Sequence, residues 1–186
     1  LALTLLLAAA LFVLRILPYD TRTLSQFVLP EAGCAAPCWH GIRPGMTSAD
    51  AALDELHRHD WIDGIALDMN YLRADGWLNW QWANLPGDAP VMAANNSIRI
   101  DYNTVTSIRL STRVQLGDLW LLLGTPDDVR RMQYGDQIFL SLTYDMESLF
   151  AQVELPCGAP AHAVWRAAVM LLWLKDIPPA AQPASF

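Results

Sequence analysis

The residues of this chain best suited to chemistry are its cysteines and the histidine that follows two of them. Cys34 and Cys38 are four positions apart, Pro37 and Trp39 lie beside Cys38, and His40 follows directly. In an exported domain, two cysteines at such a short spacing most often form a disulfide. We therefore predict a Cys34–Cys38 disulfide at the start of a domain that folds outside the cytoplasm.

Other chemistry remains open for the same residues. A redox-active pair needs low-pKa thiols, but the spacing is Cys-x3-Cys rather than Cys-x2-Cys. Zinc needs a third and a fourth ligand, for which His40 is near and Cys157 is distant in sequence. Cys157 could instead form a long-range bridge to Cys34 or Cys38. A free Cys38 beside His40 would favour a thiol-dependent or hydrolytic enzyme, which is our alternative function.

The remaining polar residues favour solvated surfaces over catalytic or metal sites. His57 and His59 are two apart and would not face each other on a helix, so a solvated helix end is favoured over a metal pair. Residues 127–131 (DDVRR) fit a salt-bridged surface loop or the rim of a binding site. The sequence has no nucleophile elbow, Walker or dinucleotide motif. We expect no catalytic residues, no metal and no cofactor.

The tryptophans of one short segment are the candidate binding residues. Residues 77–82 (WLNWQW) alternate as in a strand, which places Trp80 and Trp82 on one face and Trp77 on the other. Tryptophan is enriched both in cores and at binding hot spots. Core packing stays open as an explanation, and we predict a binding surface formed by Trp77, Trp80 and Trp82.

The first residues set the expected compartment. Residues 1–17 are apolar except for Thr4 and Arg15, in a stretch slightly shorter than the roughly 20 residues that cross a bilayer. The chain begins without Met, so we expect that a few further residues precede it, and no small-x-small cleavage site follows. We predict an uncleaved transmembrane or signal-anchor helix, with a cleaved signal peptide or a lipid on Cys34 as alternatives. Residues 18–33 are expected to form an extended linker.

Composition excludes one class of partner. The net charge is −7, the sequence pI is about 4.8, and Lys175 is the single lysine. A phosphate-binding surface needs clustered positive charge. We therefore expect no nucleic-acid binding. Once the anchor is removed, the remaining length suits one ordinary domain with a real core.

The expected elements alternate between helices and strands. A helix is predicted from Thr47 and a second from Leu116 to Leu123, where Gly124 ends it. Strands are predicted at residues 77–82, 97–102, 105–110, 137–144 and 150–155, with a packed apolar segment at 162–175 and a disordered tail at 178–186. This order predicts an α+β fold of two helix-on-antiparallel-sheet units in tandem. The units span residues 41–102 and 103–156 of a domain covering 34–177.

Two motifs carry a resemblance to a bacterial family. Residues 116–126 end in Leu-Leu-Gly-Thr-Pro, which resembles the helix ending of the SmpA/OmlA (BamE-like) lipoprotein family. Gly45-Met46-Thr47 resembles the opening of the same motif, although residues 55–58 depart from its ending. Two such units in tandem are similar to the β-lactamase inhibitor protein fold. The Pro-Cys-Trp-x-Gly-Ile-x-Pro-Gly stretch at 37–45 resembles bacterial membrane-anchored proteins.

The resemblance implies a scaffold that binds protein without catalysis. Together with the predicted anchor and disulfide, it indicates a membrane-anchored, extracytoplasmic module of the bacterial envelope. Its expected partner is a protein or another envelope component. We expect localisation at the cell membrane through a single span, with the domain on the extracytoplasmic side.

Overall fold

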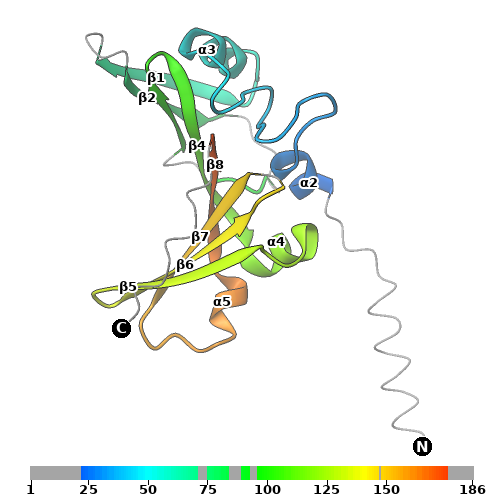
Figure 1. Cartoon of the computed structure of the whole chain (residues 1–186), viewed down its shortest axis with the longest axis vertical. Helices are drawn as coiled ribbons and strands as arrows, with labels where there is room; N and C mark the ends of the chain where they lie inside the picture. Colours follow the sequence, from blue (N-terminus) through cyan, green and yellow to red (C-terminus); the bar gives the residue numbers. More distant parts are fainter. Residues whose placement is uncertain (1–21, 71–74, 84–88, 93–95, 147, 176–186) are drawn as a thin grey trace, which may run out of the picture.

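One antiparallel sheet organises the chain. The computed structural model describes residues 22–70, 75–83, 89–92, 96–146 and 148–175. Its eight strands lie in the order β1-β2-β3-β4-β8-β7-β6-β5 (Figure 1). The strands are β1 (Ile62–Asn70), β2 (Asp75–Trp82), β3 (Asn96–Asp101), β4 (Thr104–Gln115), β5 (Asp128–Tyr134), β6 (Gln137–Tyr144), β7 (Leu149–Pro156) and β8 (Ala168–Leu174). The helices are α2 (Arg22–Val28), α3 (Ala49–His57), α4 (Leu116–Leu123) and α5 (Ala163–Arg166).

The predicted fold class, two helix-on-antiparallel-sheet units in tandem behind a transmembrane helix, is wrong. β4 pairs with β8 from Ser107↔Leu174 to Gln115↔Ala168, so all eight strands share a single continuous sheet. The prediction failed because the apolar segment at 162–175 was expected to pack against the domain without forming a strand. Residues 168–174 instead form a central strand, and Val169, Leu171 and Trp173 are buried on one of its faces.

The predicted transmembrane helix is not part of this fold. Across the ranges that the structure describes, no helix combines the length and the apolar character needed to span a membrane. The stretch 1–17, to which that prediction and the signal anchor apply, lies outside the described residues, as does the predicted tail at 178–186.

The segment expected to be an extended linker contains a helix. Leu24 and Val28, one helical turn apart in α2, are buried in the main core. Residues four apart lie on the same face of a helix, so this pair gives α2 an apolar side against the domain. Residues 22–28 of this segment therefore pack into the folded domain.

Several predicted elements are confirmed. α3 begins after Ser48, whose hydroxyl accepts a hydrogen bond from the Ala51 amide, while Thr47 Oγ1 accepts from the Arg43 amide instead of capping the helix. The hairpin of β3 and β4 turns at Tyr102 and Asn103, both with positive φ. β2, α4, β6 and β7 also lie where the sequence predicts them.

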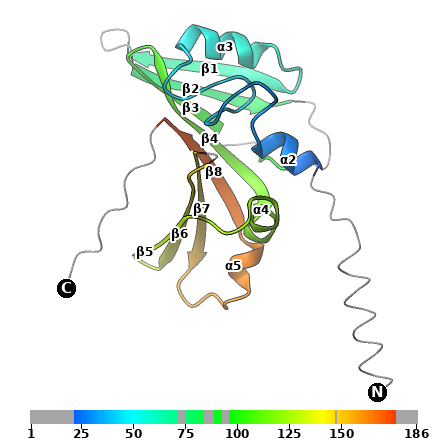
Figure 2. The same ribbon diagram turned by 45° about the vertical axis from the view of Figure 1, so that its right-hand side comes forward.

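The four helices of the described residues lie on one side of the sheet. Inward-facing strand residues such as Leu78, Ile98, Ile108 and Leu171 are fully buried in one core cluster with residues of α2, α3 and α4. In Figure 2 the helices follow one side of the sheet, and no labelled helix covers the other. The opposite residues of each strand therefore form a face without helical cover.

Candidate protein-binding face

The uncovered side of the central strands is the candidate site, here called the open face. Strand register brings Trp77 opposite Arg99, Ser97 opposite Arg109, and Arg109 opposite Leu172. The same alternation continues into β7, where Gln152 lies opposite Met170. The open face consists of Trp77, Asn79, Ser97, Arg99, Arg109, Ser111, Met170, Leu172, Phe150 and Gln152.

The side chain of Arg99, on the neighbouring strand, restrains Trp77. The Arg99 guanidinium carbon lies 4.9 Å from the centroid of the Trp77 ring, in cation–π geometry. Arg99 Nε donates to Asp101 Oδ1 at 3.0 Å, and Thr106 Oγ1 donates to the other carboxylate oxygen at 3.1 Å. Trp77 nevertheless keeps 38% of its surface exposed. A large aromatic side chain on a restrained support loses little entropy when a partner covers it.

Arg109 is the second prominent side chain of the open face. Its Nε donates to Met170 Sδ at 2.8 Å, which fixes the base of the guanidinium. Within the described residues, no carboxylate lies at ion-pair distance from Arg109. Its charge is therefore available to a ligand.

The open face is hollowed on both sides of Arg109. One hollow of about 510 Å³ is lined by Asp68, Trp77, Asn79, Ser97 and Arg109. Another of about 300 Å³ is lined by ten residues, among them Arg109, Met170, Gln152, Phe139 and Glu154. Arg109 lines both, so a partner that fills the two hollows must pass over it.

The three predicted binding tryptophans do not share a surface. Trp77 lies on the open face, whereas Trp80 is 3% exposed and Trp82 is half-buried on the helix-covered face. The alternation of β2 requires this division, because adjacent positions of a strand point to opposite sides. The sequence analysis did not single out Arg99 and Arg109, which lie on the same face of the sheet as Trp77. The pattern that could have drawn attention to them is an arginine on each of two neighbouring strands, at positions that alternate to the same side of the sheet as Trp77.

Trp80 and Trp82 belong to a cluster of rings, here called the covered cluster. It unites side chains from α2, the cysteine loop, the end of α3, β2 and β8: Phe27, Trp39, His40, His59, Trp61, Trp80, Trp82 and Trp173. Neighbouring ring centroids are 4.5–6.4 Å apart. Four buried indole N–H groups in it, those of Trp39, Trp80, Trp82 and Trp173, have no hydrogen-bond acceptor among the described residues. Ring packing thus holds this cluster together.

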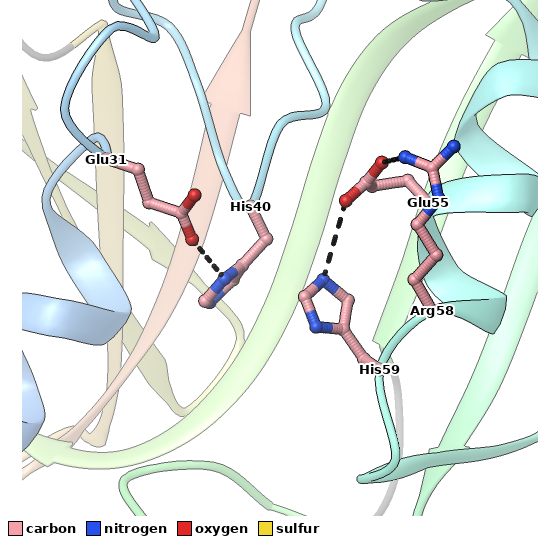
Figure 3. A network of polar contacts seen from close by, with 5 residues as sticks. All are labelled: Glu31, His40, Glu55, Arg58 and His59. Atoms are coloured by element: carbon pink, nitrogen blue, oxygen red, sulfur yellow. Dashed lines mark hydrogen bonds and ion pairs between the residues drawn. The ribbon is translucent and has the colours of Figure 1, made fainter.

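Two histidines of the covered cluster each face a glutamate (Figure 3). His40 Nδ1 lies 3.0 Å from Glu31 Oε1, and His59 Nε2 lies 4.0 Å from Glu55 Oε1. Desolvation by burial lowers the pKa of His40, and the nearby His59 lowers it further, while Glu31 opposes both effects. The part of the chain that the structure describes contains no group of three or more His, Cys, Asp or Glu side chains placed to hold a metal ion.

The cysteine loop delivers Trp39 to the covered cluster. Cys34 and Cys38 lie at disulfide distance with Cα atoms 5.9 Å apart, and Cys38 is fully buried. Trp39 and Ile42 then exchange backbone hydrogen bonds of 3.0 and 2.9 Å around a tight turn. His40 and Gly41, the central turn residues, both have positive φ, which fits a type I′ turn. A bonded, buried Cys38 offers no thiolate beside His40, which weighs against the alternative enzyme.

Cys157 lies apart from this loop. It is exposed and forms no disulfide with a described cysteine. Its thiol donates to the Gly135 carbonyl at 3.9 Å, and its backbone amide donates to the Asp136 carbonyl at 2.6 Å in the turn after β5. The long-range bridge considered for Cys157 is therefore absent from the described residues.

No family model, curated protein or solved structure matches this chain. The resemblance to the SmpA/OmlA family therefore stays a prediction from the sequence motifs.

Proposed function

We propose that this protein is an extracytoplasmic protein-binding module that holds a protein of the cell envelope against its open face, without catalysis. The observation that carries the proposal is Trp77, a 38% exposed tryptophan stacked on a restrained arginine beside hollows in an uncovered sheet face. Tryptophan and arginine dominate the hot spots of protein interfaces. Their combination here supports a protein ligand.

The proposed extracytoplasmic location is supported by the cysteine pair and not by the open face. Cys34 and Cys38 at disulfide distance fit an oxidising environment, since such bonds are rare in the cytosol. Localisation at a cell membrane remains a prediction from the sequence. An envelope protein would share the compartment in which the disulfide persists.

The proposal is tested by site-specific photo-crosslinking in the full chain. A benzophenone amino acid replaces the exposed Asn79 on the open face in one variant. In the control variant it replaces Leu121, which is 68% exposed on α4 on the covered side. We expect a discrete crosslinked protein from position 79 in the native cells, and none of the same mass from position 121.

The specificity of that product is tested with matched tryptophans. Trp77→Ala should abolish the product formed at position 79 because the aromatic anchor is lost. Trp165→Ala, which removes a 47% exposed tryptophan of α5, should leave it unchanged. A product that survives Trp77→Ala, or the absence of any product at position 79, would overturn the proposal.

A further inference from the structure

We infer that the partner presents a single carboxylate side chain to Arg109, flanked on both sides by basic side chains. The inference rests on the proposed function and specifies the chemistry of its ligand. Arg109 differs from two other arginines on this side of the sheet. Arg99 is paired with Asp101 at 3.0 Å and Arg130 with Asp128 at 2.7 Å, whereas no described carboxylate pairs with Arg109.

The surroundings of Arg109 suit a carboxylate. Its cross-strand neighbour is Ser97, which is 9% exposed, and Asn79 lines the same hollow. Both are neutral groups able to donate a hydrogen bond to an oxygen anion. Arg109 Nε is held by Met170, and no hydrogen bond to a described residue occupies the terminal nitrogens of the guanidinium. These nitrogens can therefore bind both oxygens of one carboxylate.

The flanking charges limit the ligand to one anion at this position. Exposed Asp68 lines the hollow on one side of Arg109, and exposed Glu154 lines the hollow on the other. Neither is ion-paired with a described residue. Apart from the Arg99–Asp101 ion pair, the open face and its two flanking hollows thus present charges in the order negative (Asp68), positive (Arg109), negative (Glu154). A complementary partner carries positive, negative, positive in the same direction.

This order of charges favours a protein segment over nucleic acid or an anionic lipid surface as the partner. A run of phosphates, as in nucleic acid or an anionic lipid surface, would place further negative charge against Asp68 and Glu154. The net charge of −7 would also repel such a polyanion at long range. A protein segment with one acidic residue between basic ones avoids both penalties and can fill the two hollows.

A random-peptide library displayed on phage provides the probe. The full oxidised chain is the target, and peptides that also bind its Trp77→Ala variant are removed. We expect the retained peptides to carry an Asp or Glu with Lys or Arg on both sides. Synthetic copies should bind Arg109→Ala at least about tenfold more weakly, as expected for loss of a hydrogen-bonded charge pair.

Matched variants separate charge from folding. Arg109→Lys keeps the charge without the planar fork and should recover part of the affinity. Arg131→Ala removes an exposed arginine of β5 that lies opposite Leu140 and outside the open face, so it should bind as wild type does. Near-ultraviolet circular dichroism of the buried tryptophans checks that each variant is folded.

The failures of the two proposals are distinguishable. Peptides that require Trp77 but carry no acidic residue, or bind Arg109→Ala as tightly as wild type, would overturn the carboxylate inference alone. If the library yields no peptide whose binding depends on Trp77, the open face fails as a protein-binding surface and both proposals fall. Trp77-dependent, acid-containing peptides that lose affinity with Arg109→Ala but not with Arg131→Ala would support both.

Discussion

Trp77 and Trp80 stand three positions apart on the same strand and have opposite environments. Trp77 is 38% exposed and stacks on one charged side chain, whereas Trp80 is 3% exposed and contacts the rings of Trp39 and Trp82. Strand alternation sends them to different sides of the sheet. The helices and the cysteine loop then cover one side only, so the same residue type serves packing on one face and stays accessible on the other.

The two regions also differ in the interactions that hold them. The covered cluster relies on ring packing and leaves several indole N–H groups without an acceptor in the described part of the chain. The open face relies on ion pairs and hydrogen bonds at its surface, such as Arg99 with Asp101. Substitutions in the covered cluster should therefore lower stability, and substitutions on the open face should lower binding.

The largest expected effect is that of Trp39→Ala. Trp39 is 2% exposed and contacts Phe27, Trp61, Trp80 and other rings of the covered cluster. Truncating a buried tryptophan leaves a cavity, and we expect the free energy of unfolding to fall by about 3–5 kcal/mol. Urea denaturation followed by tryptophan fluorescence measures it. An equal loss from Trp77→Ala would contradict the division between the two regions.

The next effect is that of removing the bond that anchors the covered cluster. The double variant Cys34→Ala with Cys38→Ala should lose about 2 kcal/mol, because closing a loop of so few residues restricts the unfolded chain only moderately. Cys157→Ala is the matched control, since Cys157 is exposed and forms no disulfide with a described cysteine. Both are measured by urea denaturation. Equal stability of the double variant and wild type would show that the turn at residues 39–42 holds the cluster without the bond.

Local sequence patterns were sufficient for the elements whose periodicity is clean. The alternation of β2 and β3 follows from their side chains, and α4 ends at Gly124 as the sequence predicts. β1 was missed because Gly64, with positive φ, interrupts its alternation, and its register shifts between Asp63 and Ala66. Asp128–Tyr134 was missed because its many polar residues resemble a loop, and it is an exposed edge strand.

The site depends on long-range pairing that periodicity does not contain. An apolar stretch such as residues 168–174 fits a helix or a strand equally well, and only its pairing with β4 and β7 makes one sheet from two sets of strands. That pairing also determines that Arg109 meets Leu172 and Met170 across the open face. The tryptophans could be assigned to opposite faces from sequence, but which face the helices cover could not.

His40, a member of the covered cluster, should make the stability of the protein depend on pH. Burial and His59 lower its pKa, while Glu31 and Glu55, which also face it, act in the opposite direction. The unfolded chain keeps the ordinary value of about 6.5 and so binds more protons than the folded chain below that pH. The folded state accommodates neutral His40. The contribution of this residue to the free energy of unfolding is therefore fully present above about pH 6.5, and it is lost as the pH falls toward the lowered pKa of the folded state.

The His40 effect is measured as the change in urea midpoint between about pH 7.5 and about pH 5.5, a window that spans the ordinary histidine pKa. His40→Gln should show a smaller decrease than wild type, because its side chain does not titrate. His57→Gln, at an exposed position of α3, should keep the wild-type decrease. The same slope in His40→Gln and wild type would assign the acid sensitivity to groups other than His40.

The smallest expected effect lies at the β2–β3 end of the open face. A double-mutant cycle of Trp77→Ala and Arg99→Ala should give a coupling in unfolding free energy of about 0.5–1 kcal/mol, the usual size of an exposed cation–π contact. Binding of the crosslinked partner should respond far more strongly to Trp77→Ala, because hot-spot aromatics contribute at least about 2 kcal/mol. Comparable effects on stability and binding would mean that Trp77 serves the fold as Trp80 does, and the functional distinction between the two faces would be lost.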